Sequence, residues 1–264
     1  MERPSLYHEA HGSGGPFLLL VHGMLSSRAQ WLPNLAALSA VCRPVVVELL
    51  GHGRSPTPDD PALYTPAHYV AEFERIRLAL GTERWFVCGQ SLGAALTLRY
   101  ALDDPDHVIA QVFTNSNSAL AGDEWVERVR PVIEAQARRL ETEGRSLLDR
   151  RPLNPGRSHR LSPEARAALT TDYALHTPRG IAYTGLYTVP DSSVRSRLGE
   201  NRVPTLLVVG EREERFREHR LFAERTMPML EVVGLDAGHA VNLETPEEFN
   251  RAVTAFLGRW TALA

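Results

Sequence analysis

The stretch that decides the fold is an apolar run that leads into a serine framed by glycines: Trp85-Phe86-Val87-Cys88-Gly89-Gln90-Ser91-Leu92-Gly93. Residues 85–88 predict a buried strand, and residues 94–102 predict a helix. A serine at so sharp a strand-to-helix turn takes a strained backbone, and a Cβ on either neighbouring glycine would clash. The turn would present the Ser91 hydroxyl at a helix amino end, where free N–H groups favour negative charge. Ser91 is therefore the candidate nucleophile.

Short apolar runs alternate with longer helical patterns along most of the chain. This alternation is typical of βαβ units and predicts an α/β fold, with a mainly parallel central sheet flanked by helices. Further strands are expected at 17–21, 44–50, 108–114, 203–209 and 229–233, and helices at 31–40, 64–80 and 245–260. Residues 5–10 alternate weakly, and we expect them to pair with 17–22 as a hairpin across the turn at 11–16.

Residues 119–198 interrupt this alternation. They show helical patterns at 124–143 and 163–175 but no strand that clearly pairs with the sheet, and they carry a net charge of +3 against −6 elsewhere. We interpret 119–198 as a helical cap or lid inserted into an α/β core made of 1–118 and 199–264. Its arginines would favour an anionic ester, or would simply dock a basic lid on an acidic core; the candidates are Arg128, Arg130, Arg138 and Arg139.

Composition excludes several classes of protein. The chain has 264 residues, 43% hydrophobic and 23% charged, with a net charge of −3, which is too apolar and too balanced for a disordered chain. No apolar run approaches the ~18 residues of a membrane span, and the start lacks the basic stretch and apolar core of a signal peptide. No basic block suited to nucleic acid is present. We expect a cytoplasmic protein that acts on a small molecule, without membrane or nucleic-acid partners.

Two further counts narrow the chemistry. All 29 basic residues are arginine, which excludes Schiff-base aldolases, pyridoxal-phosphate enzymes and Walker-type nucleotide hydrolases, because each of them needs a lysine. The two cysteines, Cys42 and Cys88, are too few for a disulfide framework or a zinc site. We expect neither a metal nor an organic cofactor.

The segment Val21-His22-Gly23-Met24 ends the predicted strand 17–21. In a site built around Ser91, the backbone N–H of Met24 would pair with that of Leu92 to form an oxyanion hole. His22 is either a catalytic base or a residue that fixes this loop through hydrogen bonds. The second role is favoured.

The predicted acid and base follow the last two strands. His239, in Asp236-Ala237-Gly238-His239, stands where a loop would return an imidazole to Ser91. The acid is expected in the loop 210–216, where Glu213 is favoured and Glu214 is the alternative. Such a carboxylate would orient His239 and stabilise its protonated form.

Together these segments resemble the α/β-hydrolase superfamily over nearly the whole chain. The resemblance rests on residues 21–24, 48–55, 89–93, 210–216, 238–239 and 245–249. Glu48 and Leu50 stand where the family usually has Asp and Pro, and Glu213 stands where it usually has Asp. The strand 108–114 ends in Asn115, so the alternative acid position of some relatives carries no carboxylate, which favours Glu213.

The resemblance implies a serine hydrolase that cleaves a carboxylic ester, lactone or thioester of a small molecule through an acyl-enzyme on Ser91. Haloalkane dehalogenases and epoxide hydrolases of this fold use an aspartate nucleophile, so Ser91 argues against both. The sequence is also similar to that of the menaquinone-pathway synthase that eliminates pyruvate, but Ala94 and Ala95 stand where that lyase has an arginine. The alternatives are such a lyase, a C–C bond hydrolase, or a poorly active binding protein of the same fold.

Overall fold

A seven-stranded sheet forms the centre of the computed structural model, which describes residues 4–263. The strand order is β1-β3-β2-β4-β5-β6-β7; β1 is antiparallel to β3, and the other neighbours are parallel. The strands are β1 (His8–Ala10), β2 (Phe17–Val21), β3 (Arg43–Val47), β4 (Trp85–Gly89), β5 (Val108–Thr114), β6 (Thr205–Gly210) and β7 (Leu230–Leu235). This confirms the predicted α/β class and mainly parallel sheet.

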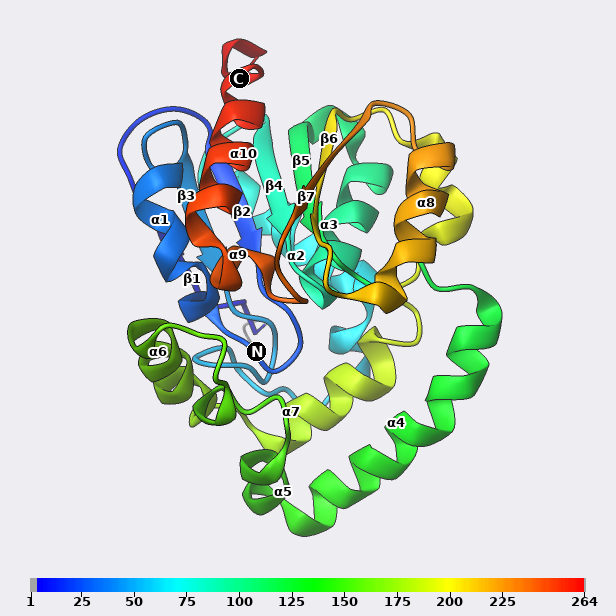
Figure 1. Cartoon of the computed structure of the whole chain (residues 1–264). Helices are drawn as coiled ribbons and strands as arrows, with labels where there is room; N and C mark the ends of the chain where they lie inside the picture. Colours follow the sequence, from blue (N-terminus) through cyan, green and yellow to red (C-terminus); the bar gives the residue numbers. More distant parts are fainter. Residues whose placement is uncertain (1–3, 264) are drawn as a thin grey trace.

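Helices cover both faces of the sheet (Figure 1). Along β2, Leu18 and Leu20 pack toward α1 (Leu32–Leu38) and α10 (Pro246–Gly258). Leu19 and Val21 point the other way, toward α2 (Pro66–Ala79) and α3 (Leu92–Asp103). Each fully buried aliphatic side chain contributes about 1.5–3 kcal/mol, so a strand with five buried residues has its place in the centre of the sheet. Helix α8 (Arg217–Thr226) packs beside α3 against β5 and β6.

The expected hairpin between residues 5–10 and 17–22 is wrong. Strand β1 pairs with β3, His8 opposite Val47, and β2 is enclosed between β3 and β4. The turn 11–16 bonds to β3 instead: His11 N donates to Pro44 O (2.8 Å), and Arg43 N donates to Pro16 O (2.7 Å). In a hairpin, β1 would pair with β2 in the position that β3 occupies. All five residues of β2 are buried, which agrees with its place between β3 and β4.

Four α-helices stand between β5 and β6 and lie beyond the carboxyl ends of the parallel strands (Figure 1). They are α4 (Asp123–Glu143), α5 (Arg145–Arg150), α6 (Pro163–Tyr173) and α7 (Pro178–Tyr183). Residues 119–198, called the inserted segment below, contain no strand and bury a small core of their own against Leu25. No helix among residues 4–263 is both long and apolar enough to cross a membrane.

Several of the bonds that attach the inserted segment to the core lie in a short stretch, residues 172–180, called the anchor below. Asp172 accepts hydrogen bonds from Ser27 Oγ and from Arg54 Nη2, both at 2.9 Å. Thr177 N donates to Gly51 O at 3.0 Å. Backbones also touch directly, because a Cβ at Gly180 would lie 2.3 Å from the Cα of Gly51. The anchor is therefore made of buried polar bonds and a glycine–glycine contact.

Candidate active site

Ser91 lies at the turn between β4 and α3 with a strained backbone, φ 53° and ψ −116°. The glycines around it meet backbone rather than open space. A Cβ on Gly89 would lie 2.3 Å from Gly93 O, and one on Gly93 would lie 2.2 Å from Val21 O. The turn therefore requires both glycines, and the sequence holds a serine in a conformation that L-residues rarely take.

The loop after β2 packs against this turn. A Cβ on Gly23 would lie 3.0 Å from the Cβ of Ser91, so Met24 follows directly beside the turn. Within residues 4–263, neither Met24 N–H nor Leu92 N–H donates a hydrogen bond to a protein group. Unpaired amides are rare in folded proteins. Both of these amides lie next to the serine turn, Met24 directly after Gly23 and Leu92 directly after Ser91.

Two buried imidazoles hold the residues on either side of Met24. His22 Nδ1–H donates to Gly23 O (2.7 Å), and its Nε2 accepts from Leu49 N–H (3.1 Å). His52 Nδ1–H donates to Leu50 O (3.0 Å), and its Nε2 accepts from Leu25 N–H (3.1 Å). Both side chains are fully buried, with both ring nitrogens engaged. His22 therefore fixes the loop, in the role favoured from sequence.

A third imidazole joins this pair from the inserted segment. The rings of His22 and His52 are 5.2 Å apart, those of His52 and His176 are 5.1 Å apart, and His176 Nδ1 accepts from Gly53 N–H at 2.9 Å. Burial lowers the pKa of each ring to about 3. The three rings are neutral near pH 7, as their acceptor nitrogens require. Sequence reasoning assigned no role to His52 or His176.

Glu213 and His239 are hydrogen-bonded: His239 Nδ1 lies 2.7 Å from Glu213 Oε2. Glu213 is buried at the end of the loop after β6, whereas Glu214 is exposed. The His239 side chain is 37% exposed, so part of its ring stays open to a ligand. Of the two carboxylates considered from sequence, the fold brings Glu213 to the histidine.

Three more donors surround the Glu213 carboxylate. Asn115 Nδ2 donates to Oε2 (3.0 Å), while Asn117 Nδ2 (3.0 Å) and Arg215 Nε (2.8 Å) donate to Oε1. Burial alone would raise the pKa of Glu213, but the hydrogen bond and charge of His239, with these donors, bring it to about 2. Glu213 is thus a fixed anion. Asn115 and Asn117 were missed as site residues, although both follow a strand end.

The histidine loop is tied to the serine turn by one side-chain hydrogen bond and is held internally by a second. Gln90 Nε2 donates to His239 O at 3.1 Å, and Gly238 N donates to Glu244 Oε2 at 3.0 Å. The segments that carry Ser91, Met24, Glu213 and His239 therefore meet at one edge of the sheet. Each follows a different strand, β4, β2, β6 and β7. Crevices at this edge are where open α/β sheets bind ligands.

The arginines singled out on α4 differ in their positions. Arg138 and Arg139 are 69% and 57% exposed and approach Glu134 and Glu143 of the same helix. Arg138 and Arg139 are therefore not among the candidates that the helix turns inward. Arg130 is also exposed. Arg128 lines a cavity of about 890 Å³ that also has Asn117 in its wall, between the start of α4 and α8.

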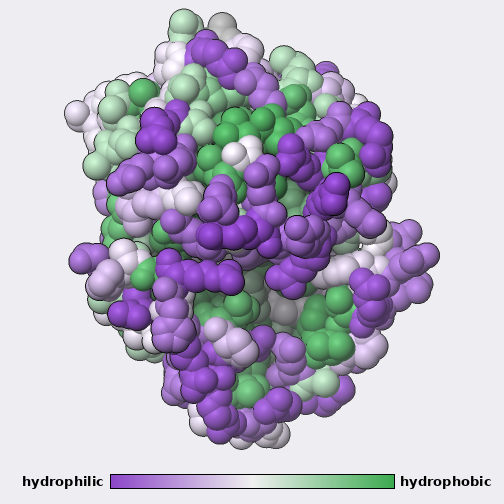
Figure 2. Space-filling model, in the orientation of Figure 1, coloured by the Kyte–Doolittle hydropathy of each residue, from purple (hydrophilic) through white to green (hydrophobic). Residues whose placement is uncertain are grey.

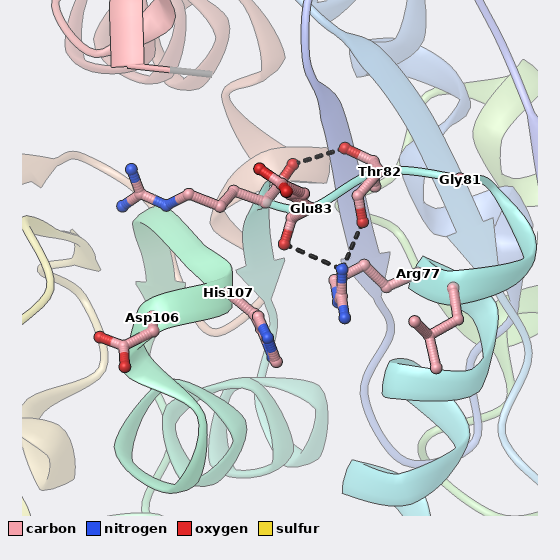
Figure 3. Close-up of a pocket in the computed structure, with 8 residues that line it drawn as sticks. Arg77, Gly81, Thr82, Glu83, Asp106 and His107 are labelled. Atoms are coloured by element: carbon pink, nitrogen blue, oxygen red, sulfur yellow. Dashed lines mark hydrogen bonds between the residues drawn. The ribbon is translucent and has the colours of Figure 1, made fainter.

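Figure 2 shows a hollow between the core and the inserted helices, with hydrophilic residues along its rim. A smaller cavity of about 150 Å³ is lined by Met24 together with residues of α4 and α7. A further cavity of about 490 Å³ lies at the opposite edge of the sheet, where Arg77 donates to Thr82 O and Glu83 O (Figure 3). It is far from the serine turn because its loops precede β4 and β5.

Comparisons with known proteins agree with this fold. The chain is 26% identical over 245 residues to Carboxylesterase YbfK of Bacillus subtilis (strain 168), covering 92% of this chain and 80% of that protein. MenH from S. aureus matches with a TM-score of 0.84 at 19% identity, covering 96% and 98% of the two chains. The enol-lactonase from Burkholderia xenovorans LB400 gives 0.77 at 21% identity, covering 96% of each chain. The profile described as alpha/beta hydrolase fold matches residues 16–246, and the chain therefore belongs to this family.

Proposed function

We propose that this chain hydrolyses a carboxylic ester, lactone or thioester of a small molecule through an acyl-enzyme on Ser91. The observation that carries the proposal is the 2.7 Å bond between Glu213 and His239, on loops that meet the strained Ser91 turn. A buried carboxylate that holds an imidazole beside a serine is the arrangement that activates the hydroxyl.

The mechanism follows from the roles these groups are fitted for. Ser91 Oγ attacks the substrate carbonyl while its proton passes to His239 Nε2. The N–H groups of Met24 and Leu92 stabilise the oxyanion, and each such donor is worth about 3 kcal/mol in the transition state. The alcohol leaves with the proton from His239. A water molecule, deprotonated by the same ring, then attacks the acyl-enzyme and releases the acid.

Glu213 serves as the triad acid in this proposal. It keeps the Nδ1 proton on His239 and stabilises the imidazolium that forms in each half-reaction. The Glu213 side chain is one methylene longer than the aspartate that is usual in this family. Its carboxylate is held next to the His239 ring by further hydrogen bonds from Asn115, Asn117 and Arg215.

The inserted segment, residues 119–198, serves as a lid in the same proposal. Its helices lie over the carboxyl edge of the sheet, and their residues line the cavity beside Met24. A lid in this position would exclude water and select the acyl group.

Hydrolysis is favoured over the elimination reaction considered from sequence. Ala94 and Ala95 are fully buried on α3, so the helix after the turn offers no cation to an eliminated carboxylate. A binding protein of this fold would not need two unpaired amides beside the serine.

A fluorophosphonate probe and an ester screen test the proposal. The intact protein is treated with the probe, the labelled residue is located by mass spectrometry, and p-nitrophenyl acetate turnover is measured in parallel. We expect the probe to label Ser91 alone and to leave Ser91→Ala unlabelled. Ester turnover should decrease in proportion to the fraction of protein that is labelled. A protein that is labelled without turning over any ester, thioester or lactone would be a binding protein.

A further inference from the structure

The cavity beside Met24 is apolar except for two side chains. Its volume is about 150 Å³, and it lies between α4, α7 and the loop after β2. Most of the wall is aliphatic, with Ile133, Leu140, Ile181 and Val189 among its residues. The polar exceptions are Arg151 and Gln136. A ligand in this cavity would meet hydrocarbon and one guanidinium.

Arg151 is a half-buried cation without an acidic partner. Its Nη2 donates to Gln136 Oε1 at 2.8 Å, and within residues 4–263 no carboxylate lies within 4.0 Å of its guanidinium. Its neighbour along the chain differs, because Arg150 pairs with Glu143. Burial lowers the pKa of Arg151, yet an arginine stays protonated near neutral pH. The charge therefore sits in partly desolvated surroundings with a single neutral acceptor.

A partly buried guanidinium is unfavourable unless acceptor groups bind its N–H groups. Removing a charge from water is unfavourable without a compensating ion or hydrogen bonds. Gln136 accepts one of the five N–H groups of the guanidinium. A carboxylate is the matching group, because it accepts two parallel N–H bonds from the planar fork. Arginines of the inserted segment that already pair with an acidic residue, such as Arg139 and Arg150 with Glu143, need no further carboxylate.

We propose that Arg151 binds a carboxylate of the substrate, so that the enzyme acts on esters or lactones of short dicarboxylic acids. This rests on the proposed function. The free carboxylate would lie against Arg151 and Gln136, the methylene groups along the aliphatic wall, and the ester carbonyl beyond Met24 at Ser91. A cavity of about 150 Å³ has room for a carboxylate and a few methylene groups, because one water takes about 30 Å³ of liquid volume.

Matched ester pairs test the assignment. The kcat/KM is measured for mono-p-nitrophenyl glutarate and for p-nitrophenyl valerate, which share the acyl chain length and differ in the terminal carboxylate. The proteins are the native chain, Arg151→Met, Arg151→Lys and the control Arg138→Met, whose side chain is exposed on α4. We expect the native chain to prefer the glutarate ester about 10- to 100-fold, the range of a charge-assisted bond.

In Arg151→Met we expect this preference to disappear while valerate turnover stays within about threefold of the native value. Arg151→Lys should recover part of the preference, because it keeps the charge but loses the fork. Arg138→Met should change neither substrate. A native preference for the valerate ester, or an equal loss of both substrates in Arg151→Met, would overturn the proposal.

Binding separates this proposal from the proposed function. Calorimetric binding of glutarate to the native chain and to Arg151→Met needs no turnover. If no ester is cleaved but glutarate binds the native chain and not Arg151→Met, the carboxylate site stands and the acyl-enzyme mechanism fails. If valerate is cleaved but glutarate binds both proteins equally or neither, the mechanism stands and the Arg151 assignment is wrong. Circular dichroism shows whether Arg151→Met still folds. If it does not, the ester preference and glutarate binding of Arg151→Lys test the assignment instead.

Discussion

The serine-site loops of the core and residues 123–151 of the inserted segment both carry charged side chains, but they hold them differently. In the core, the Glu213 carboxylate is buried and receives hydrogen bonds from residues on three separate segments. In residues 123–151, Arg139 and Glu143 pair along one exposed helix. Within the described chain, residues 123–151 make no hydrogen bond to the core.

This difference separates two tasks. A buried and fully bonded carboxylate fixes one geometry, which reaction chemistry requires. Exposed ion pairs on one helix fix little, because solvent screens them and long side chains lose entropy when they pair. Arg151 differs from these exposed pairs, since it is half-buried and lines a cavity without an acidic partner. We therefore expect substitutions in the core site to change rates, and most substitutions in residues 123–151 to change little.

The largest effect is expected from Ser91→Ala. Turnover of p-nitrophenyl acetate should fall by about 10⁴-fold or more, because the nucleophile is gone while the turn still accepts a small side chain. His239→Ala should lose a comparable amount, and the double variant should be no worse than either single one. Melting curves check that the fold persists. A Ser91→Ala protein that keeps most of its kcat would show that the serine turn is not the reacting centre.

Next in size is Glu213→Gln, with an expected loss of about 10³- to 10⁴-fold in kcat. The amide cannot hold the Nδ1 proton as a carboxylate does, although it preserves the size of the side chain. Glu214→Gln is the matched control: its side chain is exposed, and kcat should stay within about twofold. The reverse ranking would move the acid by one residue and leave Ser91 and His239 in their roles.

Acid should weaken the contact between the core and the inserted segment at the three neighbouring imidazoles of His22, His52 and His176. The pKa of His22, His52 and His176 is about 3 in the folded chain, below the usual value near 6.5. As pH falls below 6.5, the unfolded chain takes up protons that the folded chain refuses, so the free energy of unfolding decreases. Between pH 6.5 and 5 the decrease is about 2 kcal/mol per ring.

Urea unfolding at pH 7 and pH 5 measures this decrease. In His176→Gln it should be smaller by about one ring's contribution, because one buried titrating group is removed. His159→Gln, at an exposed residue of the same inserted segment, is the control. An identical pH dependence in the native chain and in His176→Gln would contradict the assignment of acid sensitivity to these three rings.

The smallest effect is expected from Arg139→Gln. This change removes an exposed pair with Glu143, so the melting temperature should shift by no more than about 1 °C and kcat should be unchanged. A marked loss of activity would mean that the outer face of α4 takes part in the reaction, and the distinction between the two regions would fail.

Much of the core could be predicted because its signals are local. Each strand of β2 to β7 is an apolar run, and the Ser91 turn is set by glycines within two residues of it. The predicted bounds of 17–21 and 108–114 agree with the structure, and the others differ by up to three residues, since helix and strand ends depend on tertiary contacts. The partner of β1 could not be read in the same way, because strand pairing is a long-range choice and a turn of suitable length also allows a hairpin.

The inserted segment was less predictable for a different reason. Which arginine faces a cavity depends on how α4, α5 and α7 pack, and no pattern within one helix contains that information. Arg138 and Arg139 were singled out because they lie on a recognisable helix, whereas Arg151 follows a six-residue helix with no clear pattern. The role of His176 is hidden for the same reason, since its partners are about 120 residues away in sequence.

The anchor at residues 172–180 has a consequence for how this enzyme can change over evolutionary time. Asp172, Thr177 and Gly180 fix the inserted segment to the core, while cavity residues such as Ile133 and Arg151 stand on a separate part of the chain. Mutations in 123–151 can therefore accumulate at positions that contact neither the anchor nor the catalytic loops, whereas Arg145, which donates to main-chain oxygens of Tyr173, Ala174 and His176, is tied to the anchor. New substrate preferences can arise there by drift, so a library randomised in this stretch should yield many folded variants that differ mainly in specificity.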